Sequence, residues 1–276
     1  MSPVGNTPPF TQPLDFRAES DALYALLADL KVEDFKRPTR FKQWTITDIV
    51  THLHVWNWAT EQALVDQPAL KRMVADFIAQ RETTTLRDFE KGRVGSLQGY
   101  GLLEAWREQY VKVAQRFQGV DPKRRTPWFG PDMSARSNIT ARLMETWAHG
   151  QAIYDLLGVE RVDTDRIRNI AVLGINTFEW TFTTHGQPLP LVRPYVCLSA
   201  PSGAIWSWNN PSDSDRIEGS ATEFCQVVTQ VRNVADTRLK LSGDAARNWM
   251  RIAQCFAGLP ETPPAPGTRL REIAAA

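Results

Sequence analysis

A strongly helical stretch of the chain reads Thr45-Ile-Thr-Asp-Ile-Val-Thr-His-Leu-His-Val-Trp-Asn-Trp-Ala-Thr-Glu-Gln-Ala63. Its apolar side chains recur every three or four positions, a spacing that predicts a helix from Thr45 to about Asp66 with one face turned to a core. His52 lies on that face. His54 lies about 200° further round the helix, at about 100° per residue, so we expect it to point away.

A second helix is predicted from Ser134 to Gly158, where the glycine is a suitable C-cap. Glu145 and His149 are four residues apart on this helix, so their side chains stack on one face. Ala152 continues that face, which therefore also points inward. An imidazole from one helix and a Glu-x-x-x-His pair from another can converge on one divalent cation inside a helix bundle. Three protein ligands would leave one position open, as in catalytic zinc sites.

The same residues also have a simpler interpretation. A Glu-x-x-x-His pair commonly makes a contact on a helix surface, and an inward histidine is more often a hydrogen-bonded core residue than a ligand. Spacing alone therefore leaves both interpretations open for His52, Glu145 and His149.

The chain changes character after His185, where Gly186-Gln-Pro-Leu-Pro190 interrupts the helical pattern. Before this point the sequence predicts further helices over 15–30, within 68–94, around 103–117 and over 164–184. After it, the sequence predicts a hairpin of strands at 195–200 and 204–208, a strand at 237–242, and helices at 221–231 and 245–256. We therefore expect a mainly α protein, with a four-helix bundle at 14–185, a small α+β domain at 190–258, and irregular tails at 1–13 and 259–276.

The composition is that of a globular protein of ordinary charge. The 276 residues include 42% hydrophobic and 23% charged side chains, and 32 basic residues nearly balance 31 acidic ones. A net charge of +1 gives no electrostatic reason to expect nucleic acid as a partner. No uncharged apolar run approaches the roughly 18 to 20 residues that span a bilayer, so we expect no membrane insertion. The three cysteines lack CxxC spacing and suit a reducing compartment, which predicts a cytoplasmic protein.

The N-terminal half contains two characteristic segments, Phe16-Arg-Ala-Glu-Ser-Asp-Ala-Leu-Tyr-Ala-Leu-Leu-Ala-Asp-Leu30 and Trp44-Thr-Ile-Thr-Asp-Ile-Val-Thr-His-Leu53. They resemble the mycothiol-dependent maleylpyruvate isomerase family, which belongs to the DinB-like metal-binding four-helix bundles. Two later runs are similar to a subgroup described only as metal-binding: Trp128-Phe-Gly-Pro-Asp-Met-Ser-Ala-Arg-Ser137 and Thr140-Ala-Arg-Leu-Met-Glu-Thr-Trp-Ala-His-Gly150. The C-terminal part is similar to the small, sterol-carrier-like domain that family members carry after the bundle, through Ile217-Glu-Gly219, Phe224-Cys225 and Leu241-Ser-Gly-Asp244.

The resemblance implies a ligand set and cofactors. The histidine of the family's His-Leu step falls on His52, and its Glu-x-x-x-His ligands fall on Glu145 and His149. The family typically holds a divalent ion there, zinc, and its isomerases use a low-molecular-weight thiol. They also use an arginine from the small domain near the metal, for which Arg232 is the candidate catalytic residue. The neighbourhood Gln230-Val-Arg-Asn233 lacks the second basic residue usual in the subgroup, and Arg232 could equally be a cation at a helix C-terminus.

These implications favour a metal-dependent enzyme, an isomerase or transferase that uses a thiol and acts on a small carbonyl or carboxylate compound. Two alternatives stay open: a metal-dependent hydrolase or lyase that uses metal-bound water, and a non-catalytic module that binds a metal and a small ligand. A small-molecule partner is expected in each case. Trp206 and Trp208, on predicted surface strands, could form the contact of a homodimer.

Overall fold

The computed structural model describes residues 10–129 and 132–272, and the chain divides into two compact units. One unit comprises residues 1–35 and 47–146, and the other comprises 36–46 and 147–276, apart from the positions outside the described ranges. The division falls inside a long helix, between Thr146 and Trp147, so this helix contributes to both units.

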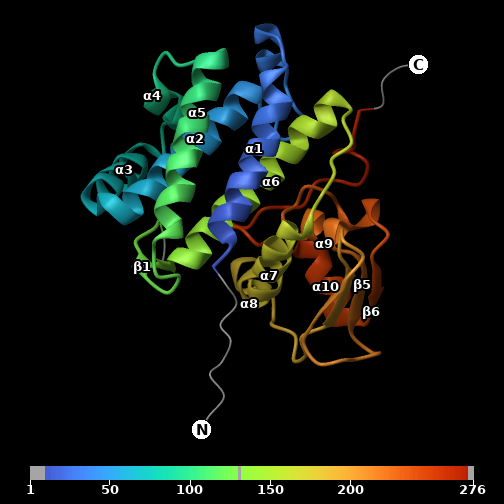
Figure 1. Cartoon of the computed structure of the whole chain (residues 1–276). Coiled ribbons are helices and arrows are strands. Elements are labelled where there is room, and N and C mark those ends of the chain that lie inside the picture. The colour runs from blue at the N-terminus through green and yellow to red at the C-terminus, as the bar shows by residue number, and fades with distance from the viewer. Residues whose placement is uncertain (1–9, 130–131, 273–276) are drawn as a thin grey trace. The chain divides into compact units, whose positions relative to one another are not determined.

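The first unit is a helical bundle (Figure 1). Its helices are α1 (Gln12–Ala28), α2 (Ile46–Val65), α3 (Gln67–Gln80), α4 (Leu86–Val94), α5 (Gly99–Gln118) and the first half of α6 (Ala135–Leu157), with the 3₁₀ helix η1 (Val32–Lys36) after α1. A short antiparallel ribbon, β1 (Arg125–Thr126) with β2 (Met133–Ser134), precedes α6. Side-chain N-caps stabilise the starts of α3 and α4. Asp66 accepts a hydrogen bond from the Ala69 amide, and Thr85 accepts one from the Asp88 amide.

Four long helices, α1, α2, α5 and α6, supply the core of this bundle. α1 packs along α5. α2 is joined to α5 by Glu61, which accepts hydrogen bonds from Gln109 and Arg116, and to α6 by a bond from Arg142 to Asn57. The helix predicted around 103–117 is confirmed as part of α5, and its large apolar side chains are buried: Leu103, Trp106, Tyr110, Val113 and Phe117.

The second unit contains a four-stranded sheet with helices packed against it. Its strands are β3 (Tyr195–Ser199), β4 (Ile205–Trp208), β5 (Arg216–Ser220) and β6 (Lys240–Ser242), in the order β4-β3-β5-β6. β3 runs parallel to β5, and the other two pairs are antiparallel. Its helices are the end of α6, η2 (Asp165–Ile167), α7 (Arg168–Asn176), α8 (Phe178–Thr184), α9 (Ala221–Val228), η3 (Val234–Asp236) and α10 (Asp244–Ile252).

Two elements differ from the expectation. The helix predicted over 164–184 is divided at Thr177, whose hydroxyl bonds to the carbonyls of Leu173 and Gly174 and whose backbone leaves the helical region. The sequence does not predict β5, because Arg216-Ile-Glu-Gly-Ser220 contains a single large apolar side chain, Ile217. That strand is fixed by its parallel pairing with β3 and not by a local pattern.

The fold class is mainly α, as predicted, with a helical bundle followed by a small α+β region. The domain bounds 14–185 and 190–258 stay predictions. α1 begins at Gln12, inside the tail predicted at 1–13, whose first nine residues lie outside the described ranges. Among the described residues, 259–272 form no helix or strand.

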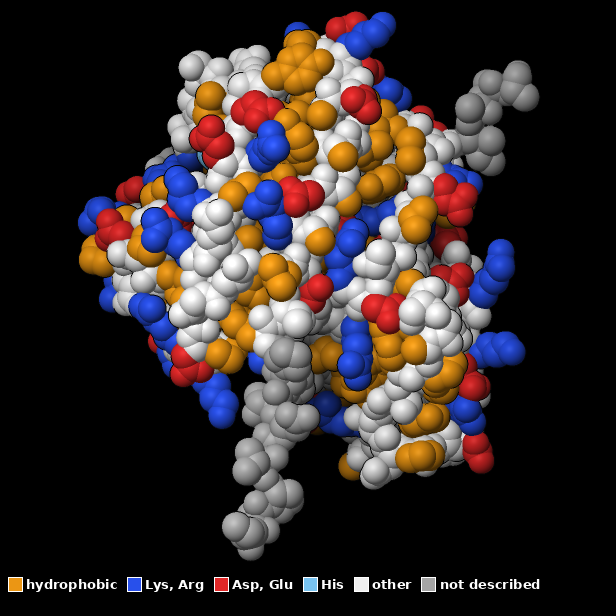
Figure 2. All heavy atoms as spheres, viewed as in Figure 1, with side chains coloured by type: hydrophobic (Ala, Val, Ile, Leu, Met, Phe, Trp, Pro, Cys, Tyr) orange, Lys and Arg blue, Asp and Glu red, His pale blue; other side chains and the backbone are white. Residues whose placement is uncertain are grey.

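Charged side chains of both signs are interspersed on the face drawn in Figure 2, in keeping with the near-zero net charge. No helix in the described part of the chain is long and apolar enough to cross a membrane. The expectation that Trp206 lies on an exposed strand surface is wrong. Trp206 is buried, because it lies opposite Leu198 on the covered face of the sheet, so a homodimer stays a prediction without that support.

Candidate metal centre

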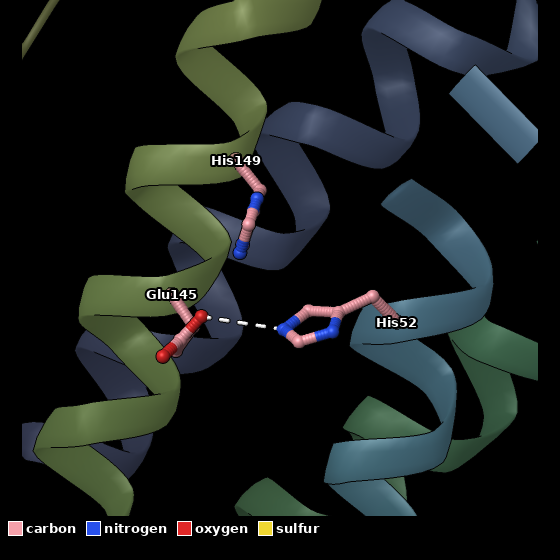
Figure 3. Close-up of side chains that lie close together, drawn as sticks. All are labelled: His52, Glu145 and His149. Atoms are coloured by element: carbon pink, nitrogen blue, oxygen red, sulfur yellow. Dashed lines mark hydrogen bonds and ion pairs between the residues drawn. The ribbon is translucent and has the colours of Figure 1, made fainter. Parts of the chain in front are cut away.

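Two helices bring the three predicted ligands together. α2 presents His52, and α6 presents Glu145 and His149 one turn apart (Figure 3). The Nε2 atom of His52 lies 3.4 Å from Oε2 of Glu145. Each of the three side chains offers one nitrogen or oxygen atom within 4.8 Å of the others. His52 is buried, and Glu145 and His149 are half-buried, so the group is partly exposed.

These distances suit a small divalent cation. Zinc bonds imidazole nitrogen and carboxylate oxygen at about 2.0–2.2 Å, so two tetrahedral ligand atoms are about 3.4 Å apart. The separation between His52 and Glu145 matches this value. Two imidazoles and one carboxylate form a donor set that zinc accepts, and they leave one of four positions for water or substrate. The residues present therefore fit a divalent metal ion.

The ring of His52 lies between two carboxylates. Its Nδ1 atom is 2.7 Å from Oε1 of Glu90, on α4, and its Nε2 atom faces Glu145. Burial by itself would lower the pKa of His52, but the charges of Glu90 and Glu145 outweigh burial and raise the pKa to about 9. A neutral imidazole has one N–H, so one nitrogen would turn its lone pair toward a carboxylate. A proton or a metal cation between Nε2 and Glu145 removes that repulsion.

Glu90 and Arg142 are charged residues at this site that the sequence analysis missed. Glu90 is fully buried, and its Oε1 atom also accepts a hydrogen bond of 2.6 Å from Nε1 of Trp56. Arg142 is buried on α6 and donates to the side chain of Asn57. Burial lowers the pKa of Arg142, and the nearby charges of Glu145 and Glu90 oppose that effect. One buried cation thus accompanies two carboxylates beside His52.

Helical spacing contains a signal for both missed residues. Glu90 follows the apolar spacing of Leu86 and Phe89 on α4, and Arg142 lies three residues before Glu145 on α6. The other charged residues of α4 hide the first signal, because a short charged helix is typical of an exposed surface: Arg87, Asp88, Lys91 and Arg93.

Two aromatic side chains of the segment 36–46 orient His149. The ring of Trp44 is parallel to the His149 ring, with centroids 5.7 Å apart, and Phe41 meets the His149 ring edge-on at 4.9 Å. These three residues belong to the second unit. Because the contacts restrict rotation of the imidazole, His149 would lose little further freedom on binding an ion.

A separate aromatic cluster borders His52 within the first unit. Trp56 lies one turn after His52 on α2, and its ring centroid is 4.7 Å from that of Phe129 and 6.0 Å from that of Trp128. Phe89 belongs to the same cluster. Gly130 and Pro131, which follow Phe129 in the run from Trp128 to Ser137 quoted above, lie outside the described residues. The Trp56 ring centroid is 6.1 Å from that of His52, so the cluster places apolar surface beside His52, which strengthens the charge interactions there.

Arg232 lies in the second unit and forms an ion pair. Its Nη2 atom is 2.6 Å from Oδ1 of Asp155 on α6, and both side chains are buried. The two residues line a cavity of about 20 Å³ together with Arg40, Phe41 and Arg269. Arg232 lies beyond the end of α9, so it is not in the last turn of that helix. The contact with Asp155 gives Arg232 a structural role, whatever it does in addition.

A family model described as the Mycothiol maleylpyruvate isomerase N-terminal domain matches residues 16–154. The chain belongs to this family. The match contains His52, Glu145 and His149, whereas Arg232 lies beyond its end. The chain is also similar to two uncharacterised proteins of Mycobacterium tuberculosis, from strains CDC 1551 / Oshkosh and ATCC 25618 / H37Rv. Each is 37% identical over 246 residues, which cover 89% of this chain and 95% of the relative.

Solved structures place the mycothiol maleylpyruvate isomerase family on the same fold. The chain is similar to crystal structures of the mycothiol-dependent maleylpyruvate isomerase and of a mutant of that enzyme with a histidine replaced by alanine. Both have a TM-score of 0.50 and cover 82% of this chain and 91% of their own, at 13% and 14% identity. At this identity the similarity concerns the fold. Coverage of 82% exceeds the segment matched by the family model, so the shared fold includes part of the second unit.

Proposed function

We propose that the protein is a metal-dependent enzyme that uses a low-molecular-weight thiol, such as mycothiol, in the isomerisation or transfer chemistry of a small carbonyl or carboxylate compound. Its ligands are His52, Glu145 and His149, and its ion is zinc. The observation that carries the proposal is the position of His52, whose Nε2 atom faces Glu145 at the separation of two zinc ligands. Family membership supplies the reaction class, with maleylpyruvate as the model substrate.

The charges around the site favour an anionic partner. The two carboxylates of Glu90 and Glu145 are opposed by Arg142 and by the two charges of a divalent ion, which leaves one positive charge in excess. A divalent ion in this position supplies an open coordination position that lowers the pKa of a thiol or polarises a carbonyl. Trp44 and Phe41 hold the imidazole of His149 in place, and the aromatic cluster around Trp56 limits access of water to His52.

Arg232 is our candidate for holding a substrate carboxylate. Support comes from two further arginines that lie beside it, Arg40 and Arg269, because guanidinium groups match carboxylates in shape and charge. Phe41 lines one cavity with these arginines and contacts the ring of His149, so the cavity adjoins one proposed ligand within the second unit. A cytoplasmic location and a homodimer stay predictions, the first supported by three free cysteines.

The first experiment measures metal content by mass spectrometry in the wild type, in His149→Ala and in His185→Ala, a control that removes another half-buried histidine. We expect about one ion per chain in the wild type and the control, and a loss in His149→Ala. Isomerisation of maleylpyruvate should then require both the ion and mycothiol. Turnover of related substrates without a thiol would favour a hydrolase or lyase, and bound metal without any turnover would favour a binding module. A folded wild type that takes up no zinc, manganese, iron or nickel would overturn the proposal.

The role of Arg232 is tested by Arg232→Lys, with Arg161→Lys as the matched control. The side chain of Arg161 is also buried, and its Nε atom lies 3.5 Å from Oδ1 of Asp163. Lysine keeps the charge but loses the two-pronged donor, so Arg232→Lys should raise KM for a carboxylate substrate by about tenfold or more, with little change in kcat. Equal effects of the two substitutions on KM would show that Arg232 acts through its ion pair alone.

A further inference from the structure

We infer that Glu90 is a positioning residue of the metal centre, which holds Nδ1 of His52 as the protonated nitrogen and turns Nε2 toward the ion. The inference rests on the proposed function, because it presupposes that His52 is a ligand. Glu90 lies on α4, outside the two helices that carry the ligands, and it belongs to the same unit as His52.

The hydrogen bonds of Glu90 assign the proton on His52. Its Oε1 atom lies 2.6 Å from Nε1 of Trp56, and an indole nitrogen can only donate, so Oε1 accepts there. The same oxygen lies 2.7 Å from Nδ1 of His52. Because Oε1 of Glu90 acts as an acceptor in both contacts, the hydrogen between it and His52 belongs to Nδ1, which donates it. In the neutral ring Nε2 is then the nitrogen with the lone pair, which a metal ion would bind, and it is the atom that faces Glu145.

Burial of the Glu90 carboxylate destabilises the fold unless a nearby positive charge compensates its charge. Glu90 is 0% exposed, and its Oε2 atom has no hydrogen-bond partner among the described residues. A buried carboxylate with one unsatisfied oxygen destabilises a fold by several kcal/mol if nothing compensates its charge. Arg142 provides part of that compensation, and a cation held through His52 would provide more. Carboxylates that accept from a ligating histidine fix the ring and make the other nitrogen a stronger ligand.

α4 has contacts to α2 besides those of Glu90. Asp48 of α2 is buried and lies 3.1 Å from Nζ of Lys91 and 3.6 Å from Nη1 of Arg87, both on α4. Phe89 adds a buried apolar anchor to the same helix. With α4 held by these contacts, the pairing of Glu90 with His52 has its main effect on the orientation of the imidazole.

The test compares metal affinity in Glu90→Gln and Glu61→Gln. Glutamine keeps the size of the side chain and removes its charge. Glu61 is a matched control, a buried glutamate of the same unit whose partners are Arg116 at 2.5 Å and Gln109 at 2.8 Å. By competition with a chelator, Glu90→Gln should weaken zinc binding by about 10- to 100-fold, and Glu61→Gln should leave it unchanged. If Glu90→Gln does not fold, Glu90→Asp, which withdraws the carboxylate by one methylene, should weaken binding by about tenfold.

Nitrogen-15 NMR of the imidazoles gives a second readout that packing alone would not change. The chain has four histidines, so the signals of His52 can be assigned with one His52→Ala sample. In the zinc-loaded wild type we expect Nδ1 to be protonated and Nε2 to be bound to the ion, with a loss of the strong Nδ1 hydrogen bond in Glu90→Gln. Equal affinity in wild type and Glu90→Gln overturns this inference alone. A wild type that takes up no metal overturns the proposed function, and this inference with it.

Discussion

His52 and His54 are two residues apart on α2, and their surroundings give them opposite acid–base behaviour. Burial lowers the pKa of His54, and a backbone hydrogen bond with Ala105 offsets only part of that effect. His52 is buried more deeply, yet Glu90 and Glu145 raise its pKa to about 9. Helical spacing predicts correctly which of the two lies on the inner face. It does not predict the pKa difference, since Glu90 comes from another helix.

Cys225 should be inert in the native protein. Burial raises the pKa of its thiol well above the usual value, and the charge of Asp163 adds to this, so almost no thiolate forms near neutral pH. Cys255 is also buried, whereas Cys197 is half-buried on β3. At pH 8 we expect a thiol reagent to modify Cys197 first and to leave Cys225 unmodified, with all three reacting in guanidinium. Peptide mass spectrometry after labelling would identify which cysteines have been modified. Rapid labelling of Cys225 in folded protein would contradict this.

At the scale of elements, the packing of α7 on α9 requires glycine, which has no side chain, at position 174. A Cβ atom at Gly174 would lie 2.9 Å from Cγ2 of Val228 and 3.2 Å from Cε1 of Phe224. The two helices therefore approach more closely than an alanine would allow. The sequence shows Gly174 only as a weak point inside a helical pattern, because the atoms that require it are fifty or more positions further along the chain.

Substitution of Gly174 by alanine should have the opposite effect on stability from the same substitution at Gly92, which has free space around its Cβ position. Alanine in a helix interior normally stabilises by about 0.5–1 kcal/mol relative to glycine, but overpacking costs about 1–3 kcal/mol. We expect Gly174→Ala to lower the free energy of unfolding by about 1–2 kcal/mol. Gly92→Ala, on α4 with no atom within 4 Å of its Cβ, should raise it by about 0.5–1 kcal/mol. Urea unfolding measures both, and a stabilised Gly174→Ala protein would show that α9 can move aside.

At the scale of the whole molecule, the features predicted from sequence are those with a local or repeated signal. Helical periodicity locates α2, α5 and α6 to within one or two residues at most ends, and the mainly α class and the family are confirmed. The assignment of His52, Glu145 and His149 to a metal stays a prediction, although the structure brings these side chains together. The groups that tune them, Glu90 and Arg142, depend on contacts between helices distant in sequence, which a single sequence does not reveal.

The unbroken course of α6 limits how this chain can be shortened. A fragment that ended at the border between the units, after Thr146, would stop in mid-helix, three residues before His149. A fragment that ended with the family match, at residue 154, would keep the three candidate ligands but lose Asp155 and with it the partner of Arg232. Any truncated protein meant to retain both the ligand set and that ion pair has to keep the helix whole and the second unit attached to it.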